Sequence, residues 1–339
     1  MRLLVTGGAG FIGSHFIRAW LHDHPNDHIV NLDLLTYAGD TSTLTDVERA
    51  HGSRYSFVQG DIGDLDFATG LLIDQRVDTV VNFASESHNS RAIVDPGSFV
   101  RTNVLGTQKL LEASRRAKVS RFHHVSTCEV YGDLPLDSAE CFSEDSPYRP
   151  RTPYSASKAS ADLLVRAYHD TFKLPITISN CANNYGPCQH PEKVIPLFAT
   201  NALDDIPLAL YKRSDHRREW IHVEDHCRAI MLILERGRIG ETYNVGTGDE
   251  RSVEAIADAV LAATGRPATL KTYVADRPGH DRRYLLDHAK ITRELGWKPS
   301  IDFASGLRDT VRWYTGNRAW WEPKRARIPD ERAWESTAG

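Results

Sequence analysis

The chain has 339 residues, of which 41% are hydrophobic and 25% are charged, and its formal net charge is −4. This is the composition of an ordinary globular protein, and the length suggests one large or two medium domains. The negative net charge excludes an overall basic field, and no apolar run reaches the roughly 20 residues that span a bilayer. We therefore expect neither a nucleic acid nor a membrane as a partner.

Five cysteines, at positions 128, 141, 181, 188 and 227, include no C-x-x-C pair. Their odd number argues against a disulfide framework, and the fifteen histidines show no metal-ligand spacing. The chain begins directly with a strand pattern, MRLLVTG, rather than with a signal peptide. We expect a cytoplasmic protein with reduced cysteines and no metal site.

Short apolar runs alternate with helix-length amphipathic stretches through the first half of the chain. This alternation predicts a parallel sheet with helices on both faces, which is a doubly wound α/β (Rossmann) fold. In such a fold, ligands bind at the carboxyl ends of the strands. The predicted strands cover 2–6, 28–33, 55–61, 78–84, 121–127 and 174–180, and the predicted helices cover 12–23, 98–117 and 156–172.

The alternation ends near residue 185. Proline-punctuated segments then mix with predicted helices at 194–203 and 252–264, and YNVGTG at 243–248 predicts one more strand of the first sheet. The sequence therefore predicts a smaller α/β substrate-binding lobe, with a cleft between the two parts. The predicted divisions are 1–182 plus about 219–251 for the Rossmann domain, about 183–218 plus 252–316 for the smaller lobe, and 317–339 for a loosely ordered C-terminal tail.

A glycine pattern follows the first predicted strand. The segment TGGAGFIG places Gly7, Gly10 and Gly13 in the spacing G-x-x-G-x-x-G, where the first helix opens. Glycines allow a tight turn, and the free N–H groups of a helix N-terminus bind a pyrophosphate. The turn, with Phe11 and Ile12 inside it, predicts a dinucleotide site.

The residues after the second and third strands extend this site. Asp33 ends the second strand, where a carboxylate accepts a hydrogen bond from a ribose 2′-hydroxyl and repels a 2′-phosphate. Leu34 next to it is not basic, so NAD is favoured over NADP. Asp61 and Ile62, after the third strand, are candidates to flank the adenine.

Tyr154 and Lys158 form a Y-x-x-x-K pattern in TPYSASKAS. Residues four apart on a helix share a face. We expect the ammonium to lower the pKa of the Tyr154 phenol from its ordinary value of about 10, so that the phenol can take a hydroxyl proton. Lys158 and Tyr154 are also expected to contact the cofactor. A second hydroxyl, that of Thr127, stands at a strand end.

Together with the glycine turn, these residues resemble the extended short-chain dehydrogenase/reductase superfamily. Longer blocks narrow the resemblance to the nucleotide-sugar 4,6-dehydratases, and above all to the dTDP-glucose 4,6-dehydratases, over roughly residues 1–315. The blocks are ESH at 86–88, STCEVYGD at 126–133, NNYGPCQHPEKVIPLF at 183–198, REWIHVEDHCRA at 218–229 and RPGHDRRYLLD at 277–287.

The resemblance implies a lyase that uses NAD as a catalytic cofactor. Its favoured substrate is dTDP-glucose, and its product is the 4-keto-6-deoxy sugar. By the resemblance, Thr127 hydrogen-bonds the reacting hydroxyl, Tyr154 takes the C4 hydroxyl proton as hydride passes to NAD, and Glu129 removes the C5 hydrogen. A neighbouring acid then protonates the departing C6 hydroxyl, and hydride returns to C6.

The resemblance also implies how the substrate is held and how the chain assembles. Arginine suits a diphosphate because its guanidinium forms paired hydrogen bonds. A homodimer is implied, paired through helices around 98–117 and 154–172. The implied substrate contacts are Asn183, Lys193, Arg218 and Arg277 toward the diphosphate, and Glu86 and His88 near the hexose.

One catalytic position departs from the family. Where the family has an aspartate that serves as the acid, this chain has Cys128. The thiol could simply pack, as buried cysteines do. It could instead keep the acid role, because a thiol with a pKa of about 8.5 is protonated at neutral pH and the Glu129 charge raises that pKa further. Its weakness in that role is poor hydrogen bonding by S–H.

Other functions stay open at this point. A Cys-Glu pair also resembles nucleotide-sugar dehydratases that make 5,6-unsaturated sugars (exo-glycals), in which hydride returns to C4. The segments YKRSDHRREW and SESHNSRA depart from the family pattern as well, which leaves the sugar and base open. A 4-epimerase would need no acid–base pair at 128–129, and a non-catalytic NAD-binding regulator would not need Tyr154, Lys158 or Glu129.

Overall fold

The computed structural model describes residues 1–212, 214–276 and 281–328. In this part of the chain, the larger sheet has seven strands, all parallel, in the order β10-β6-β5-β4-β1-β2-β3. This is the doubly wound order, and it reverses between β1 and β4. The strands are β1 (Arg2–Thr6), β2 (His28–Asp33), β3 (Tyr55–Gln59), β4 (Thr79–Asn82), β5 (Arg121–Thr127), β6 (Ile176–Cys181) and β10 (Thr242–Val245).

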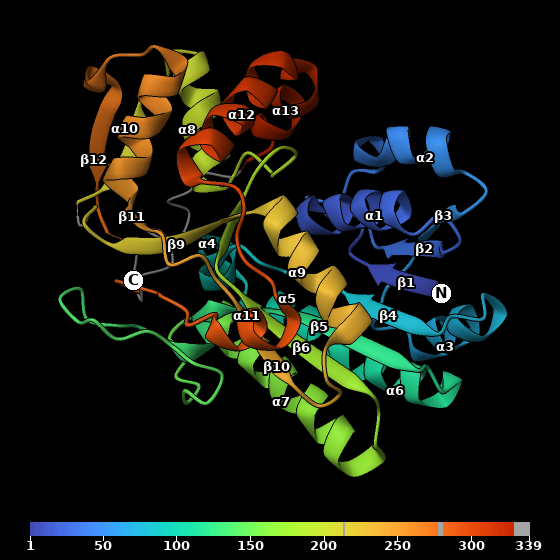
Figure 1. The fold of residues 1–339 in the computed structure, drawn as a ribbon. Coiled ribbons are helices and arrows are strands. Elements are labelled where there is room, and N and C mark those ends of the chain that lie inside the picture. The colour runs from blue at the N-terminus through green and yellow to red at the C-terminus, as the bar shows by residue number, and fades with distance from the viewer. Residues whose placement is uncertain (213, 277–280, 329–339) are drawn as a thin grey trace.

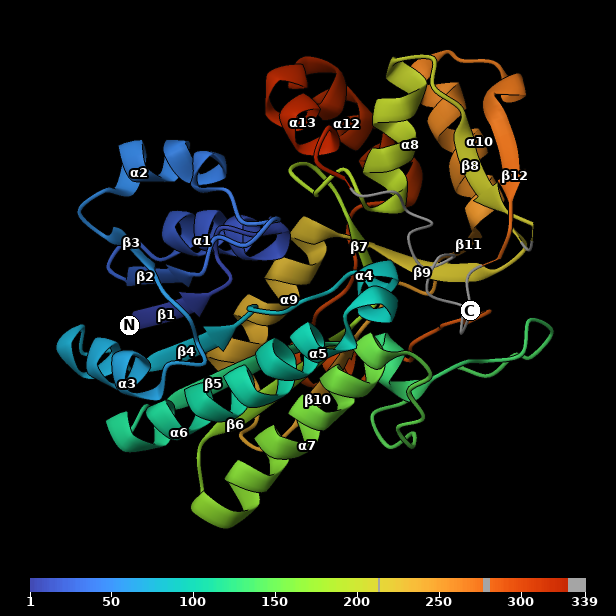
Figure 2. The same cartoon turned by 180° about the vertical axis from the view of Figure 1, so that it is seen from behind.

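Helices cover both faces of this sheet because its strands are apolar on both sides. Leu4 of β1 packs in one hydrophobic cluster, and its neighbours Leu3 and Val5 pack in another. Figure 1 shows α1 (Phe11–Asp23), α9 (Val223–Arg236) and α11 (Ala289–Leu295) on one face. Figure 2 shows α3 (Leu65–Asp74), α6 (Thr107–Ala117) and α7 (Pro153–Phe172) on the other. The doubly wound fold predicted from the alternation is confirmed.

The helix predicted at 98–117 is not continuous. It is divided into α5 (Pro96–Phe99), a π-helical stretch η2 (Val100–Gly106) and α6. The wider π turn accommodates two close contacts: a Cβ at Gly106 would lie 3.0 Å from Ile62, and Asn103 turns its buried amide inward. Asn103 Nδ2 donates to Ser157 Oγ of α7 at 2.9 Å. Two short segments, η1 (Thr41–Leu44) and α2 (Thr45–His51), follow β2.

A second lobe sits over the carboxyl ends of the large sheet (Figure 1). Its strands are β7 (Asn183–Tyr185), β9 (Arg217–His222) and β11 (Glu250–Ser252) in one sheet, and β8 (Leu208–Tyr211) and β12 (Lys271–Val274) in another. Its helices are α8 (Val194–Leu203), α10 (Val253–Thr264), η4 (Ala268–Leu270), α12 (Phe303–Gly316) and α13 (Arg318–Arg325).

Part of the predicted tail belongs to this lobe. Residues 318–325 form α13, because Trp321 is fully buried among apolar residues of α8, α10 and α12. The indole Nε1 of Trp321 donates to the Tyr314 carbonyl at 2.7 Å. Residues 329–339 lie outside the described residues. The division of the chain into two domains remains a prediction.

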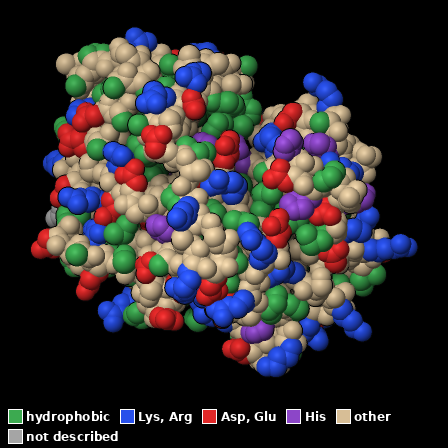
Figure 3. All heavy atoms as spheres, viewed as in Figure 1, with side chains coloured by type: hydrophobic (Ala, Val, Ile, Leu, Met, Phe, Trp, Pro, Cys, Tyr) green, Lys and Arg blue, Asp and Glu red, His purple; other side chains and the backbone are tan. Residues whose placement is uncertain are grey.

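Charged side chains of both signs are interspersed over the face seen in Figure 3. Within residues 1–212, 214–276 and 281–328, no helix combines the length and the apolar character needed to cross a membrane.

Candidate active site

A cavity of about 780 Å³ lies between the carboxyl ends of the large sheet and the second lobe. The turns after β1, β2, β4 and β5 line one side, and α8, β9 and α10 line the other. Most of the residues predicted for the site therefore share one space. Those that line it are Gly7, Gly10, Phe11, Ile12, Gly13, Asp33, Asp61, Ile62, Glu86, His88, Thr127, Glu129, Tyr154, Lys158, Asn183, Lys193 and Arg218.

The glycine turn leaves no room for side chains. Gly7 has φ +67°, and a Cβ there would stand 2.7 Å from the Ala84 nitrogen. A Cβ at Gly13 would stand 2.5 Å from the Gly7 oxygen. Helix α1 begins at this turn with Gly10 as its N-cap, without a side-chain cap or an acidic residue in its first turn. Its first N–H groups thus suit a phosphate, which fits the predicted dinucleotide.

Asp33 is fixed beside this turn. Its Oδ2 accepts a hydrogen bond from the Ala9 N–H at 3.0 Å, and its Oδ1 accepts one from the Leu35 N–H at 2.8 Å. Burial raises the pKa of the Asp33 carboxyl above its ordinary value, and the two N–H donors oppose that shift. Asp61 and Ile62 line the neighbouring wall. The carboxylate is thus held beside the glycine turn, at the wall of the cavity.

Tyr154 and Lys158 both lie on α7, but the pKa of Tyr154 does not move in the predicted direction. Burial and the Glu129 charge raise the pKa of Tyr154 well above its ordinary value, whereas a hydrogen bond from Thr127 opposes the shift. The Lys158 ammonium instead donates to the Val125 carbonyl at 2.8 Å, and burial lowers the pKa of Lys158. The expectation that Lys158 would bring the phenol pKa down was wrong for this structure, because burial dominates.

The turn after β5 separates two adjacent side chains. Thr127 Oγ1 accepts a hydrogen bond from the Glu129 N–H at 3.3 Å and so caps the short helix η3 (Cys128–Tyr131). Glu129 lines the cavity, whereas Cys128 is 1% exposed and is not among the lining residues of the described chain. The thiol packs in a cluster with Val130 and Ala159. Burial first, and the Glu129 charge second, raise its pKa well above the ordinary value.

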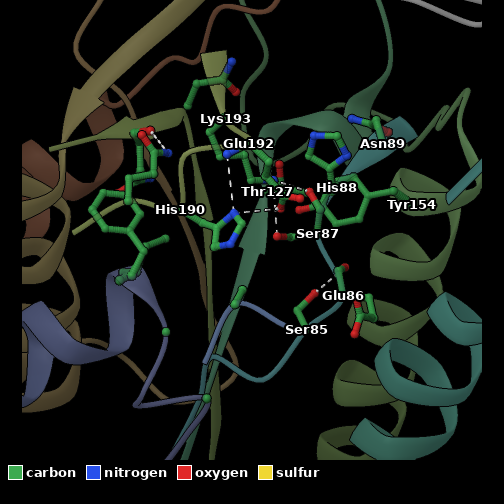
Figure 4. A pocket seen from close by; sticks show the side chains of 18 of the residues that line it. Ser85, Glu86, Ser87, His88, Asn89, Thr127, Tyr154, His190, Glu192 and Lys193 are labelled. Atoms are coloured by element: carbon green, nitrogen blue, oxygen red, sulfur yellow. Dashed lines mark hydrogen bonds and ion pairs between the residues drawn. The ribbon is translucent and has the colours of Figure 1, made fainter. Parts of the chain in front are cut away.

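Asn89 is a cavity residue that the sequence did not single out. It begins α4 (Asn89–Val94), and its Nδ2 donates to Glu129 Oε2 at 3.0 Å. Figure 4 shows Asn89 beside His88 and Tyr154. Nothing in the local pattern at 85–91 indicates this contact, because the partner is 40 residues away in the sequence.

Glu86 and His88 lie on the loop that leads from β4 into α4, at the wall shown in Figure 4. Asn103 holds this loop: its Oδ1 accepts from the Glu86 N–H and its Nδ2 donates to the Glu86 carbonyl, both at 2.9 Å. Burial is the main cause that raises the pKa of the Glu86 carboxyl. The π-helical stretch therefore positions the loop that carries Glu86 and His88.

The basic residues predicted for the diphosphate come from separate segments. Lys193, the N-cap of α8, donates through Nζ to the Ser87 carbonyl at 2.8 Å. Arg218 of β9 is buried, and its guanidinium carbon lies 4.6 Å from the centre of the Tyr284 ring. Both side chains line the cavity. Arg277 lies outside the described residues.

A buried carboxylate beside Lys193 joins the two lobes. Glu192 Oε1 accepts from Tyr37 Oη at 2.7 Å, and Oε2 accepts from Arg91 Nε at 3.1 Å. Glu192 stands in the block NNYGPCQHPEKVIPLF, but its partners come from other parts of the chain. The described residues contain no cluster of three or more His, Cys, Asp or Glu side chains suited to a metal ion.

Comparison with known proteins identifies the family. The family model described as GDP-mannose 4,6 dehydratase matches residues 4–310. The chain belongs to this family. Within the GDP-mannose 4,6-dehydratase family, it is similar to the dTDP-glucose 4,6-dehydratase of Streptomyces niveus, with 47% identity over 98% of this chain and 97% of that protein. It is 48% identical to the one of Mycobacterium tuberculosis, over 95% of this chain and 96% of that protein.

Solved structures agree with this assignment. The dTDP-glucose 4,6-dehydratase of Streptomyces venezuelae, determined with NAD bound, matches with a TM-score of 0.92 and 50% identity, over 96% of this chain and all of that one (100%). The UDP-glucose 4-epimerase of Thermotoga maritima matches with a TM-score of 0.86 but only 27% identity, over 94% of this chain and 100% of that one. The dehydratase branch predicted from the sequence is therefore confirmed.

Proposed function

We propose that this protein is an NAD-dependent dehydratase that converts dTDP-glucose into the 4-keto-6-deoxy sugar. One observation carries the proposal: Thr127, Glu129 and Tyr154 line the same cavity as the uncapped glycine turn. Glu129, a base that can remove a hydrogen from carbon, and Tyr154, a phenol that can take a hydroxyl proton, thus share a cavity with a candidate dinucleotide site. The full-length likeness to dTDP-glucose 4,6-dehydratases supports the same substrate.

The residues present fit the cofactor. The N–H groups of the turn at Gly10, Phe11, Ile12 and Gly13 would bind the pyrophosphate, because no side chain caps them. The carboxylate of Asp33 would accept the ribose hydroxyls, and Asp61 and Ile62 would flank the adenine. NAD, when bound, supplies the redox chemistry by taking hydride from C4 of the hexose and giving it back at C6.

The residues of α7 and β5 handle the C4 proton. Tyr154 Oη takes the proton of the C4 hydroxyl. Burial and the Glu129 charge raise the pKa of its phenol, and the hydrogen bond from Thr127 opposes that shift. Lys158, fixed by the Val125 carbonyl, would hold the cofactor ribose beside the phenol. A ketone at C4 then acidifies the hydrogen at C5.

Glu129 is the base for that hydrogen. It lines the cavity between Thr127 and Tyr154, and the Asn89 amide fixes one of its oxygens. The elimination breaks the C6–O bond, and the hydroxyl leaves as water. Cys128, one candidate for its acid, packs away from the cavity, which favours the packing role over the acid role.

The opposite wall would hold the nucleotide sugar. Lys193, Arg218 and Asn183 line it, and their cationic and amide groups suit a diphosphate. Arg277 lies outside the described residues, and its role toward the diphosphate stays a prediction. Glu86 and His88 are proposed to contact the hexose, because they occupy the loop next to Glu129's partner Asn89.

We also propose a homodimer and a cytoplasmic location. Large apolar side chains are exposed along the π-helical stretch and α7, at Leu105, Leu163 and Phe172, where a helix pair of a second copy would cover them. The five cysteines are free, as a reducing compartment requires.

Incubation with dTDP-glucose tests the reaction. We expect the alkali-induced absorbance of a 4-keto sugar, and deuterium placed at C4 should appear at C6 of the product. An exocyclic alkene in the NMR spectrum, with deuterium kept at C4, would identify a 5,6-dehydratase instead. If the protein binds NAD tightly but turns over neither dTDP-glucose nor any other nucleotide hexose, the result would favour a non-catalytic NAD-binding regulator.

A further inference from the structure

The Asn89 side chain is oriented by Glu129. A carboxylate oxygen only accepts hydrogen bonds, so the amide must present its nitrogen to Glu129 Oε2, and the 3.0 Å contact fixes which end of the amide faces the carboxylate. The backbone that carries Asn89 is itself held, since Asn103 binds the Glu86 main chain on both sides. The contact therefore joins two anchored segments.

The carbonyl end of the Asn89 amide is less favourably placed than its nitrogen. Among the described residues, Asn89 Oδ1 is buried without a hydrogen-bond partner. A buried carbonyl oxygen without a donor destabilises the folded state, and an apolar side chain of similar size would avoid that cost. The hydrogen bond to Glu129 is thus the contribution that an amide makes here and that an apolar side chain could not make.

Glu129 differs in position from the other carboxylates of the cavity. The carboxyl groups that line the cavity are Asp33, Asp61, Glu86, Glu129 and Glu192. Of these, Glu129 alone belongs to the turn beside Tyr154, and its charge raises the pKa of Tyr154 and of Cys128. With Oε2 bound to Asn89, Oε1 is the oxygen left to take a proton from the sugar.

We propose that Asn89 is a positioning residue that fixes the Glu129 carboxylate in the orientation from which it removes the C5 proton. The hydrogen bond holds one carboxylate oxygen in place, so that the other faces the reacting carbon. This inference rests on the proposed dehydration.

Substitution at Asn89 tests the positioning. Asn89→Leu keeps the size and removes the donor, so we expect kcat to fall on the order of 10²-fold with KM little changed, because misplacing a catalytic group by an ångström has that effect. The thermal midpoint should stay equal or rise, since the buried carbonyl is gone. Asn89→Gln, which keeps the donor, should recover part of kcat.

The matched control is Asn26→Leu, the same change at an exposed turn, which should leave kcat unchanged. A full-speed Asn89→Leu variant would overturn the positioning role. So would a variant whose loss of kcat is accompanied by a lower thermal midpoint, because that result indicates damage to the fold.

A wild-type protein that makes no 4-keto product from dTDP-glucose would contradict the proposed dehydration. A wild-type protein that makes this product, while Asn89→Leu keeps its full rate, would overturn the positioning role alone, and the two failures are thereby distinguished.

Discussion

The two ends of the cavity are built differently. At the dinucleotide end, the main chain of one contiguous turn, residues 7–13, forms the site, and glycines are present because no Cβ fits. At the elimination end, side chains from separate elements meet: Asn89 from α4, Thr127 and Glu129 after β5, and Tyr154 from α7. A main-chain site is set by local sequence, whereas a side-chain site depends on how distant elements pack.

This difference predicts separable defects. Changes at the dinucleotide end should weaken NAD binding and leave kcat at saturating NAD nearly intact. Changes at the elimination end should lower kcat and leave NAD binding intact.

The largest effect is expected at Glu129. Glu129→Gln keeps the shape and the hydrogen bonding but removes the base, so kcat should fall about 10²–10⁴-fold. Formation of the 4-keto product measures the rate, and titration with NAD should give the wild-type affinity. Dehydration at full speed would remove Glu129 from the mechanism.

A weaker but selective effect is expected at Gly7. Gly7→Ala would strain a residue at φ +67° and press a Cβ against Ala84, so NAD should bind roughly tenfold to a hundredfold more weakly. Gly70→Ala is the matched control, because its Cβ would meet no atom within 4 Å. Calorimetric titration measures both. Equal NAD affinity in the two variants would contradict the main-chain site.

Asp33→Asn should have a smaller effect on the same end. The neutral amide can still accept one of the two main-chain hydrogen bonds, but it binds ribose hydroxyls less well. We expect NAD affinity to fall about threefold to tenfold, the worth of one net hydrogen bond. The preference for NAD over NADP should also become smaller. A competition titration that shows an unchanged preference would argue against the role of the carboxylate.

The smallest effect is expected at Cys128, although it lies beside Glu129. Because the thiol packs away from the cavity, Cys128→Ala should lower kcat by less than about tenfold, through packing alone. The free energy of unfolding should fall by about 1 kcal/mol in a denaturant titration. A loss of 10²-fold or more in kcat, with stability unchanged, would restore the acid role of the thiol.

Much of the architecture was predictable because it depends on local patterns. The strands at 28–33 and 121–127 and the helix at 194–203 form at the predicted residues, since apolar periodicity matches their burial. The helix at 98–117 was predicted as continuous because its periodicity gives no sign of the contacts of Gly106 and Asn103 that accompany the π-helical stretch. Helix α13 was missed because Trp321 is buried by residues more distant in the sequence.

The sequence by itself determined the doubly wound sheet, the glycine turn and the residues that make up the Y-x-x-x-K pair. Each of these features depends on residues that lie close together in the sequence. Only the tertiary structure decided which of two adjacent side chains, Cys128 and Glu129, faces the cavity, and which amide holds the base. It also decided that burial rather than Lys158 dominates the pKa of Tyr154. These depend on desolvation and on partners dozens of residues away, and no spacing along the chain encodes them.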